Sequence, residues 1–241
     1  MISPILLTGG SGRLGRAIMA AQQQRIVAPA RTELDVTSYE SVLNAMRHWR
    51  PDVVIHCAAV VGRKECDKDP VKAELVNVAG TRNITLACRN IGTKLVLIST
   101  AAVFDGLSGN YTETDSPNPK YFYAMTKLEA ERIAATTANH LIIRTDFFDP
   151  EGFKYEAVFA DHFCSKEPSP TIARKILVAI KKGMIGILHI SGQRMTLFEV
   201  LRPYFSNIKP ISIIESTMPD FPRDLSLSSN QFNKEHNVCE Y

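Results

Sequence analysis

The feature that most constrains the fold is a glycine-rich turn at residues 6–15, LLTGGSGRLG. The apolar residues 4–7 before it predict a short buried strand, and residues 13–24 predict the helix that follows. Glycines at positions 9, 12 and 15 suit a sharp bend, a close approach of backbone N–H groups to a pyrophosphate, and tight helix–strand packing. The start of such a helix favours an anion. We therefore expect a dinucleotide site here, although any tight strand-to-helix turn could use the same glycines.

Strand and helix patterns alternate along the rest of the chain. Strands are predicted at 25–30, 53–59, 94–99 and 140–144, and helices at 38–50, 70–90 and 121–137. Short connections in such an alternation predict an α/β fold with a Rossmann-type, doubly wound parallel sheet. Residues 1–146 are expected to form the nucleotide-binding domain, and residues 147–241 a small substrate lobe interleaved with it. Within the lobe we expect helices at 171–182 and 196–205 and strands at 186–190 and 211–214.

Composition excludes several classes of protein. The 241 residues are 45% hydrophobic and 22% charged, as in ordinary globular domains, and a net charge of +3 is too small to indicate nucleic-acid binding. No apolar run approaches the roughly 20 residues that span a bilayer, and the early first strand leads us to expect no leader peptide. The five cysteines (57, 66, 88, 164 and 239) form no C-x-x-C pair and have no histidine at metal-ligand spacing. We expect reduced thiols, no metal and a cytoplasmic location.

The ends of the second and third strands bear on the choice of cofactor. An acidic residue after the second strand favours NAD, whereas this chain has Arg31, which can pair with the 2′-phosphate of NADP. A solvated surface arginine is an equally good interpretation. Residues 35–36 would lie beside the adenine, and the small residues 57–59 leave room for a ligand. His56 is expected to be a packed, hydrogen-bonded histidine rather than a catalyst.

Catalytic chemistry is expected at Thr100, Tyr123 and Lys127. A tyrosine and a lysine four residues apart on a helix share one face, and an ammonium near a phenol lowers the pKa of the phenol. Thr100, at the end of a strand, can hydrogen-bond a carbonyl oxygen. Together these groups would polarise a C=O bond for hydride delivery and protonate its oxygen. A lone Y-x-x-x-K is common on ordinary helix faces, but its place behind a dinucleotide turn favours catalysis.

These motifs, in this order, resemble the extended short-chain dehydrogenase/reductase superfamily, and within it the dTDP-4-dehydrorhamnose reductases. The resemblance covers residues 3–147. It rests on segments 8–16 (TGGSGRLGR), 33–37 (ELDVT), 52–59 (DVVIHCAA), 76–81 (VNVAGT), 98–106 (ISTAAVFDG) and 123–129 (YAMTKLE).

The resemblance implies a cofactor and its contacts. Thr100, Tyr123 and Lys127 would be catalytic, with Lys127 also holding the nicotinamide ribose. NADP, or else NAD, would be bound by Gly9, Ser11, Gly12, Arg13, Leu14, Gly15, Arg31, Asp35, Val36, Cys57, Ala58, Ala59, Asn77, Ser99, Tyr123 and Lys127. The implied reaction is reduction of the 4-keto group of a nucleotide-linked deoxy sugar.

The chain departs from the family pattern on the substrate side. Ala101 and Ala102 replace an Asp-Tyr pair, Val60 stands where the family has an aromatic residue or histidine, and the segment before residue 161 is contracted. The substrate lobe is therefore expected to be shortened and altered. The residues expected to face the sugar are Val60, Ala101, Ala102, Val103 and Phe147, although core packing accounts equally well for Phe147.

Two alternatives follow from these departures. The chain could reduce or epimerise another carbonyl compound. It could also be a non-catalytic NADP-binding subunit, like the regulatory β subunit of methionine adenosyltransferase, which belongs to the same superfamily. The expected partner is a nucleotide-sugar substrate, with neither nucleic acid nor membrane, and a homodimer is left open.

Overall fold

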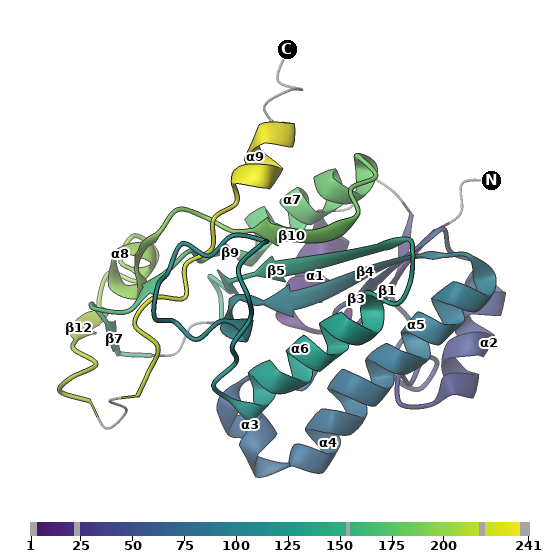
Figure 1. Ribbon diagram of the computed structural model, residues 1–241, viewed down its shortest axis with the longest axis horizontal. Helices are drawn as coiled ribbons and strands as arrows, with labels where there is room; N and C mark the ends of the chain where they lie inside the picture. Colours follow the sequence, from purple (N-terminus) through teal and green to yellow (C-terminus); the bar gives the residue numbers. More distant parts are fainter. Residues whose placement is uncertain (1–3, 22–24, 153–154, 217–219, 237–241) are drawn as a thin grey trace.

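The architecture is a parallel sheet of six strands in the order β10-β5-β4-β3-β1-β2 (Figure 1). The computed structural model describes residues 4–21, 25–152, 155–216 and 220–236, so positions 22–24 of the first expected helix and Cys239 lie outside the described residues. The strands are β1 (Ile5–Thr8), β2 (Ile26–Val27), β3 (Val53–His56), β4 (Lys94–Thr100), β5 (His140–Thr145) and β10 (Gly186–Ile190). This topology confirms the predicted doubly wound α/β class.

Helices cover both faces of the sheet. One layer holds α1 (Arg13–Ala20) and α7 (Ser169–Lys181), and the other holds α2 (Tyr39–Trp49), α5 (Gly80–Ile91) and α6 (Phe122–Ala134) (Figure 1). The neighbours Leu6 and Leu7 are both fully buried, because successive strand residues point to opposite faces and each face has its own apolar cluster. The unbroken apolar run of this strand follows from burial on both sides.

The helix expected over residues 70–90 is divided in three. It begins with α4 (Pro70–Glu74), passes through the π-helical turn η1 (Leu75–Ala79) and continues as α5. Gly92 ends it with a φ of +79°, a left-handed conformation that glycine adopts at low cost. The charged stretch before it forms the short helix α3 (Arg63–Lys68) with Cys66 buried on its inner side.

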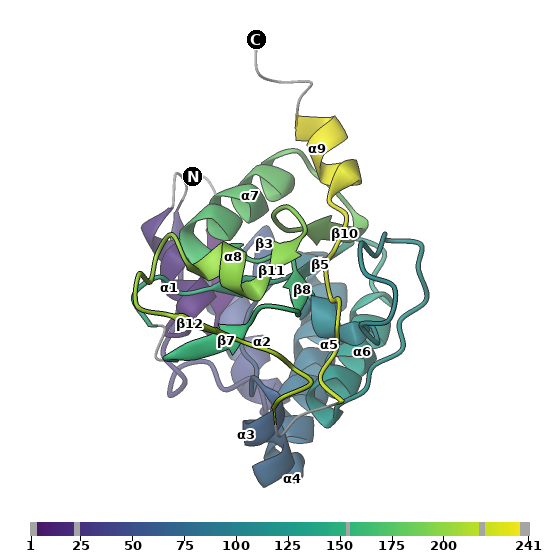
Figure 2. The same ribbon diagram turned by 90° about the vertical axis from the view of Figure 1, so that its left-hand side faces the viewer.

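A small lobe of short elements lies at the carboxyl ends of the strands and faces the viewer in Figure 2. The lobe and its connections comprise the 3-10 turn η2 (Ala101–Val103), β6 (Phe147–Phe148), β7 (Ala157–Phe159), β8 (Phe163–Cys164), β9 (Glu167–Pro168), β11 (Met195–Thr196), α8 (Leu197–Leu201) and β12 (Lys209–Ile211). Helix α9 (Asn230–His236) packs beside β10, and its Phe232 belongs to the core of the main sheet. Three two-stranded sheets, β6-β9, β7-β12 and β8-β11, hold the lobe together. The same half of the chain also supplies β10 and α7 to the main sheet and its layer, so the two halves interleave.

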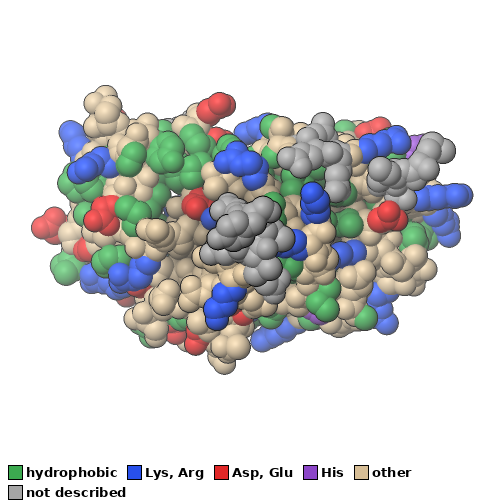
Figure 3. Space-filling view, turned by 90° about the horizontal axis from the view of Figure 1, so that it is seen from above, with side chains coloured by type: hydrophobic (Ala, Val, Ile, Leu, Met, Phe, Trp, Pro, Cys, Tyr) green, Lys and Arg blue, Asp and Glu red, His purple; other side chains and the backbone are tan. Residues whose placement is uncertain are grey.

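Two elements of the lobe differ from expectation. The helix expected over 196–205 ends at Leu201 in α8, and the strand expected over 211–214 is β12, which ends at Ile211. Among the described residues no helix is long and apolar enough to cross a membrane. Figure 3 shows lysine and arginine side chains scattered among acidic and apolar ones on the face it displays.

Candidate active site

The turn between β1 and α1 is packed so tightly that positions 9 and 15 have no room for a side chain. Gly9 has a φ of +71°, and a Cβ there would lie 2.7 Å from the backbone nitrogen of Ala58. A Cβ on Gly15 would lie 2.3 Å from the carbonyl oxygen of Gly9. Helix α1 begins after Gly12, which offers no side-chain acceptor to its first N–H groups. These donors are therefore available to an anion in front of the turn.

A cleft of about 1050 Å³ runs from this turn along the carboxyl ends of the strands. It joins the glycine-rich turn to the residues expected to be catalytic. Of the expected residues, the following line it: Gly9, Ser11, Gly12, Arg13, Leu14, Gly15, Arg31, Asp35, Val36, Cys57, Ala58, Ala59, Val60, Ser99, Thr100, Tyr123, Lys127 and Phe147.

Arg31 lies at the outer end of the cleft. Its side chain is 70% exposed, and its guanidinium is 3.7 Å from the carboxylate of Asp35. Hydrogen bonds from the backbone and side chain of Thr37 lower the pKa of Asp35, with a smaller contribution from the charge of Arg31. The pairing is loose and solvated, so the guanidinium can turn toward an anionic ligand at little cost.

His56 is a buried, neutral structural residue, as the sequence predicts. Its ring nitrogen Nδ1 is 2.7 Å from the hydroxyl of Thr8, and Nε2 is 3.1 Å from the hydroxyl of Thr81. The Thr81 hydroxyl donates to the carbonyl of Asn77, so it accepts from an Nε2–H. Burial, together with the nearby charge of Lys127, lowers the pKa of His56 to about 3. The neutral ring thus connects β1, β3 and α5.

Tyr123 stands on the first turn of α6 with its phenol in the cleft. Burial raises the pKa of the phenol, a side-chain hydrogen bond with Thr100 opposes this, and the charge of Asp146 adds to the rise. The direction is opposite to the lowered pKa expected from Lys127. The physical reason is that burial outweighs the contributions that lower this pKa, and the ammonium of Lys127 donates to the carbonyl of Ile98 at 2.7 Å. The phenol is therefore protonated at neutral pH.

Lys127 is 4% exposed and lies one helical turn after Tyr123. Burial lowers the pKa of its ammonium to about 8, and the negative charge of Glu131 opposes that shift. Glu131 is itself buried and paired with Arg144. The cleft therefore presents a proton donor and a cation whose ammonium donates to the carbonyl of Ile98.

Asn77 lies behind the cleft rather than in its lining. Its side-chain amide accepts from the backbone N–H of Val60 at 2.7 Å and donates to the carbonyl of Val60 at 3.0 Å. It also donates to the hydroxyl of Thr126, which donates to the carbonyl of Tyr123. Asn77 thus fixes the loop after β3 relative to the helix of the tyrosine.

Three residues expected to face a sugar lie outside this cleft. Ala101 and Val103 are 2% and 0% exposed, because the 3-10 turn η2 directs this segment into an apolar cluster with Phe104 and Leu227. Ala102 is half-buried on the same turn. Ala101 and Val103 therefore pack in the apolar cluster and do not line the cleft.

The cleft also contains charged residues that the sequence analysis missed. Asp146, Lys166 and Lys72 line it. Asp146 follows β5 directly, so a polar residue at the carboxyl end of a predicted strand was the available signal. Lys166 and Lys72 come from segments with no recognisable motif.

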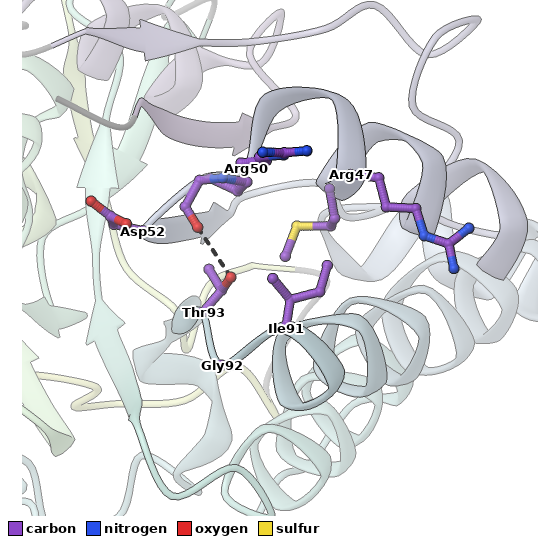
Figure 4. A pocket seen from close by; sticks show the side chains of 8 residues that line it. Arg47, Arg50, Asp52, Ile91, Gly92 and Thr93 are labelled. Atoms are coloured by element: carbon purple, nitrogen blue, oxygen red, sulfur yellow. Dashed lines mark hydrogen bonds between the residues drawn. The ribbon is translucent and has the colours of Figure 1, made fainter. Parts of the chain in front are cut away.

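A second hollow of about 390 Å³ lies at the opposite end of the sheet, before β3 and β4 (Figure 4). Arg47, Arg50 and Asp52 line it, and Thr93 donates to the carbonyl of Pro51 at 3.0 Å. The guanidinium groups in Figure 4 do not converge on one point. Open parallel sheets bind ligands at the carboxyl ends of their strands, which leaves the larger cleft as the candidate site.

The fold and the cleft together define a nucleotide-binding α/β protein of the extended short-chain dehydrogenase/reductase type. The family model described as the RmlD substrate binding domain matches residues 3–209. The chain therefore belongs to that family.

Three similar proteins illustrate the range of the family. A dTDP-4-dehydrorhamnose reductase of Streptomyces griseus is 37% identical over 53% of this chain and 43% of that enzyme. The β subunit of methionine adenosyltransferase 2 of Rattus norvegicus is 28% identical over 81% of this chain and 69% of that protein. The crystal structure of a Bacillus anthracis dTDP-4-dehydrorhamnose reductase in complex with NADP has a TM-score of 0.89 at 25% identity, covering 98% of this chain and 93% of that one. The match with the Streptomyces enzyme thus spans less than half of its length.

Proposed function

We propose that the protein is an NADP-dependent reductase of the 4-keto group of a nucleotide-linked deoxy sugar. The observation that carries the proposal is a single cleft that contains both the glycine-rich turn and the trio Thr100, Tyr123 and Lys127. The named relatives that reduce dTDP-4-dehydrorhamnose support the reaction class.

The residues of the cleft fit a dinucleotide. The glycine cradle at positions 9 and 15 has no room for a Cβ, so backbone N–H groups can approach a pyrophosphate. Arg31 would hold the 2′-phosphate that distinguishes NADP from NAD, and Lys127 would hold the nicotinamide ribose. When bound, the nicotinamide supplies the hydride.

The protein's own side chains supply the proton and stabilise the negative charge that develops during the reaction. Tyr123, protonated at neutral pH, donates its proton to the carbonyl oxygen as negative charge develops there. The hydrogen bond between Thr100 and Tyr123 aligns the phenol, and the Lys127 cation stabilises the phenolate that remains. The four described cysteines are free thiols, in keeping with the reducing cytoplasm where we propose that the protein acts.

Oxidation of NADPH with dTDP-4-dehydrorhamnose, followed by absorbance, tests the proposal. Tyr123→Phe should lower kcat by 10²-fold or more while leaving the Kd of NADPH unchanged. Tyr121→Phe is the matched control, because Tyr121 lies two residues earlier and its hydroxyl donates to the carbonyl of Asp220 outside the cleft. Equal turnover by the wild type and Tyr123→Phe would remove the tyrosine from the mechanism.

A second candidate is a non-catalytic NADP-binding subunit. It is favoured by the extent of the match with the methionine adenosyltransferase β subunit, which covers more of this chain than the match with the Streptomyces reductase does. Binding of NADPH without turnover, together with stable co-elution with a methionine adenosyltransferase catalytic subunit, would select this candidate. Turnover that depends on Tyr123 would reject it.

A further inference from the structure

An ion pair between Asp146 and Lys166 lies in the wall of the cleft. Asp146 is the first residue after β5, and Lys166 lies between β8 and β9 of the small lobe. Next to the pair, the backbone N–H of Glu167 donates to the carbonyl of Asp146 at 3.3 Å. Side chain and backbone together therefore join the end of the main sheet to the lobe at the cleft.

The pair is shielded from solvent. The side chains of Asp146 and Lys166 are only 17% and 23% exposed. The charge of Asp146 raises the pKa of Lys166 although burial acts in the other direction, so the lysine stays charged. A partly buried pair of this kind keeps a fixed geometry, unlike the loose pairs of the surface.

The carboxylate has unused capacity for hydrogen bonds. An ionised carboxylate has about four acceptor positions, and among the described residues Lys166 is the hydrogen-bond donor that occupies one of them. Asp146 and Tyr123 both line the cleft, and the charge of Asp146 acts on the phenol. A ligand bound next to Tyr123 therefore meets a fixed acceptor.

We propose that Asp146, positioned by Lys166, is a specificity-determining residue that accepts a hydrogen bond from a neutral donor on the bound ligand. A phosphate would be repelled by the carboxylate. The neutral donors available next to the reacting carbon are the amide N–H₂ of the nicotinamide and a hydroxyl of the sugar. The amide and the hydroxyl are both neutral hydrogen-bond donors, which an ionised carboxylate can accept from. The proposal rests on the proposed function, since that function supplies both ligands.

Two binding measurements separate the two sources. The first compares the Kd of NADPH with that of its 3-acetylpyridine analogue, in which a methyl group replaces the amide N–H₂. The second compares dTDP-rhamnose with dTDP by calorimetry, which isolates the contribution of the sugar. If Asp146 binds the nicotinamide amide, Asp146→Ala should raise the Kd of NADPH about tenfold and make it equal to that of the analogue. If Asp146 binds a sugar hydroxyl, the same substitution should raise the Kd of dTDP-rhamnose about tenfold and make it equal to that of dTDP.

The neighbouring ion pair of Lys175 and Glu167 provides the control. Its atoms are 2.6 Å apart, both side chains are 22% exposed, and the pair lies outside the cleft lining. Glu167→Ala should leave all four dissociation constants unchanged. Asp146→Asn, which keeps the shape of the side chain, replaces Asp146→Ala if the latter does not fold, and should weaken the same ligand.

The outcomes distinguish the two proposals. Dissociation constants for Asp146→Ala and Asp146→Asn that equal those of Glu167→Ala would overturn the role of Asp146 while leaving the reductase intact. A wild-type protein that binds NADPH but neither dTDP-rhamnose nor dTDP would instead overturn the proposed substrate. The NADPH comparison would then still decide whether Asp146 recognises the amide.

Discussion

The guanidinium of Arg144 donates to the carboxylate of Glu131 at 2.8 Å, and both side chains are at most 4% exposed. Glu131 lies one helical turn beyond Lys127 on α6, and Arg144 lies on β5. The hydroxyl of Ser99 donates to the same carboxylate. A buried polar cluster therefore connects α6 to two central strands one helical turn beyond Lys127, and the charge of Glu131 acts on the lysine ammonium.

Breaking this pair should destabilise the protein strongly. Glu131→Gln removes the charge and leaves the Arg144 guanidinium buried without its counterion, which costs about 3–5 kcal/mol of unfolding free energy. Denaturant unfolding measures the loss. Glu129→Gln is the control, because Glu129 forms an exposed pair with Arg132 at 3.3 Å and should cost less than about 1 kcal/mol. Equal losses in both variants would contradict the account of Glu131.

Activity should decline in alkaline solution. The pKa of Lys127 is lowered to about 8, so the cation is present below that pH and is lost as the pH rises through it. We expect kcat/KM to fall about tenfold per pH unit above pH 8, since kcat/KM follows the ionisation of the free enzyme. Lys127→Arg, which keeps its charge, should flatten this limb of the profile. A wild-type profile that stays level to pH 10 would show that the lysine charge is not needed.

The glycine cradle should be required for the cofactor. Gly9→Ala places a Cβ against the backbone of Ala58 at a positive φ, so it should raise the Kd of NADPH at least tenfold. Gly92→Ala has a similar φ of +79° but open space around it, far from the cleft. It should cost about 1–2 kcal/mol of stability with the Kd unchanged. Fluorescence titration of NADPH compares the two, and similar affinities would argue against the turn as the phosphate site.

Acid should destabilise the fold through its buried histidines. The pKa of His56 is lowered to about 3 and that of His189 to about 4, mainly by burial. In the unfolded chain a histidine titrates near 6.5, so below this pH the unfolded state binds protons that the folded state does not. The contribution of the neutral histidines to the free energy of unfolding is complete above about pH 6.5 and decreases as the pH falls. From pH 7 to pH 5 we expect a loss of about 2 kcal/mol per histidine, measurable by urea unfolding. Identical stabilities at the two pH values would place a charged histidine in the folded core.

Much of the fold follows from sequence periodicity because the central strands are apolar on both faces. Leu6 and Leu7 belong to a continuous apolar run, and Gly92 marks the end of a helix that its pattern already predicts. The π-turn at residues 75–79 and the helix at residues 63–68 carry no such signal. The π-turn contains Asn77, which makes tertiary hydrogen bonds with Val60 and Thr126, and a local sequence pattern does not reveal such contacts.

The candidate site divides in the same way. Local motifs bring Gly9, Tyr123 and Lys127 to one cleft, since each motif fixes its own turn or helix face. Lys166 reaches the cleft only because the small lobe folds back onto the end of β5. The side chain of Val103 is buried because the chain forms a 3-10 turn that the local sequence does not predict. Resemblance therefore identifies the cofactor end of the cleft better than the substrate end.

The most direct test of the central claim is the fate of the hydride. The protein is incubated with dTDP-4-dehydrorhamnose and NADPH in which both hydrogens at C4 of the nicotinamide are deuterium, and the nucleotide sugar is recovered and analysed by mass spectrometry. A reductase should place one deuterium on the sugar carbon that bore the keto group, and Tyr123→Phe should nearly abolish the transfer. A recovered sugar without deuterium, from wild-type protein that binds NADPH, would contradict the reductase.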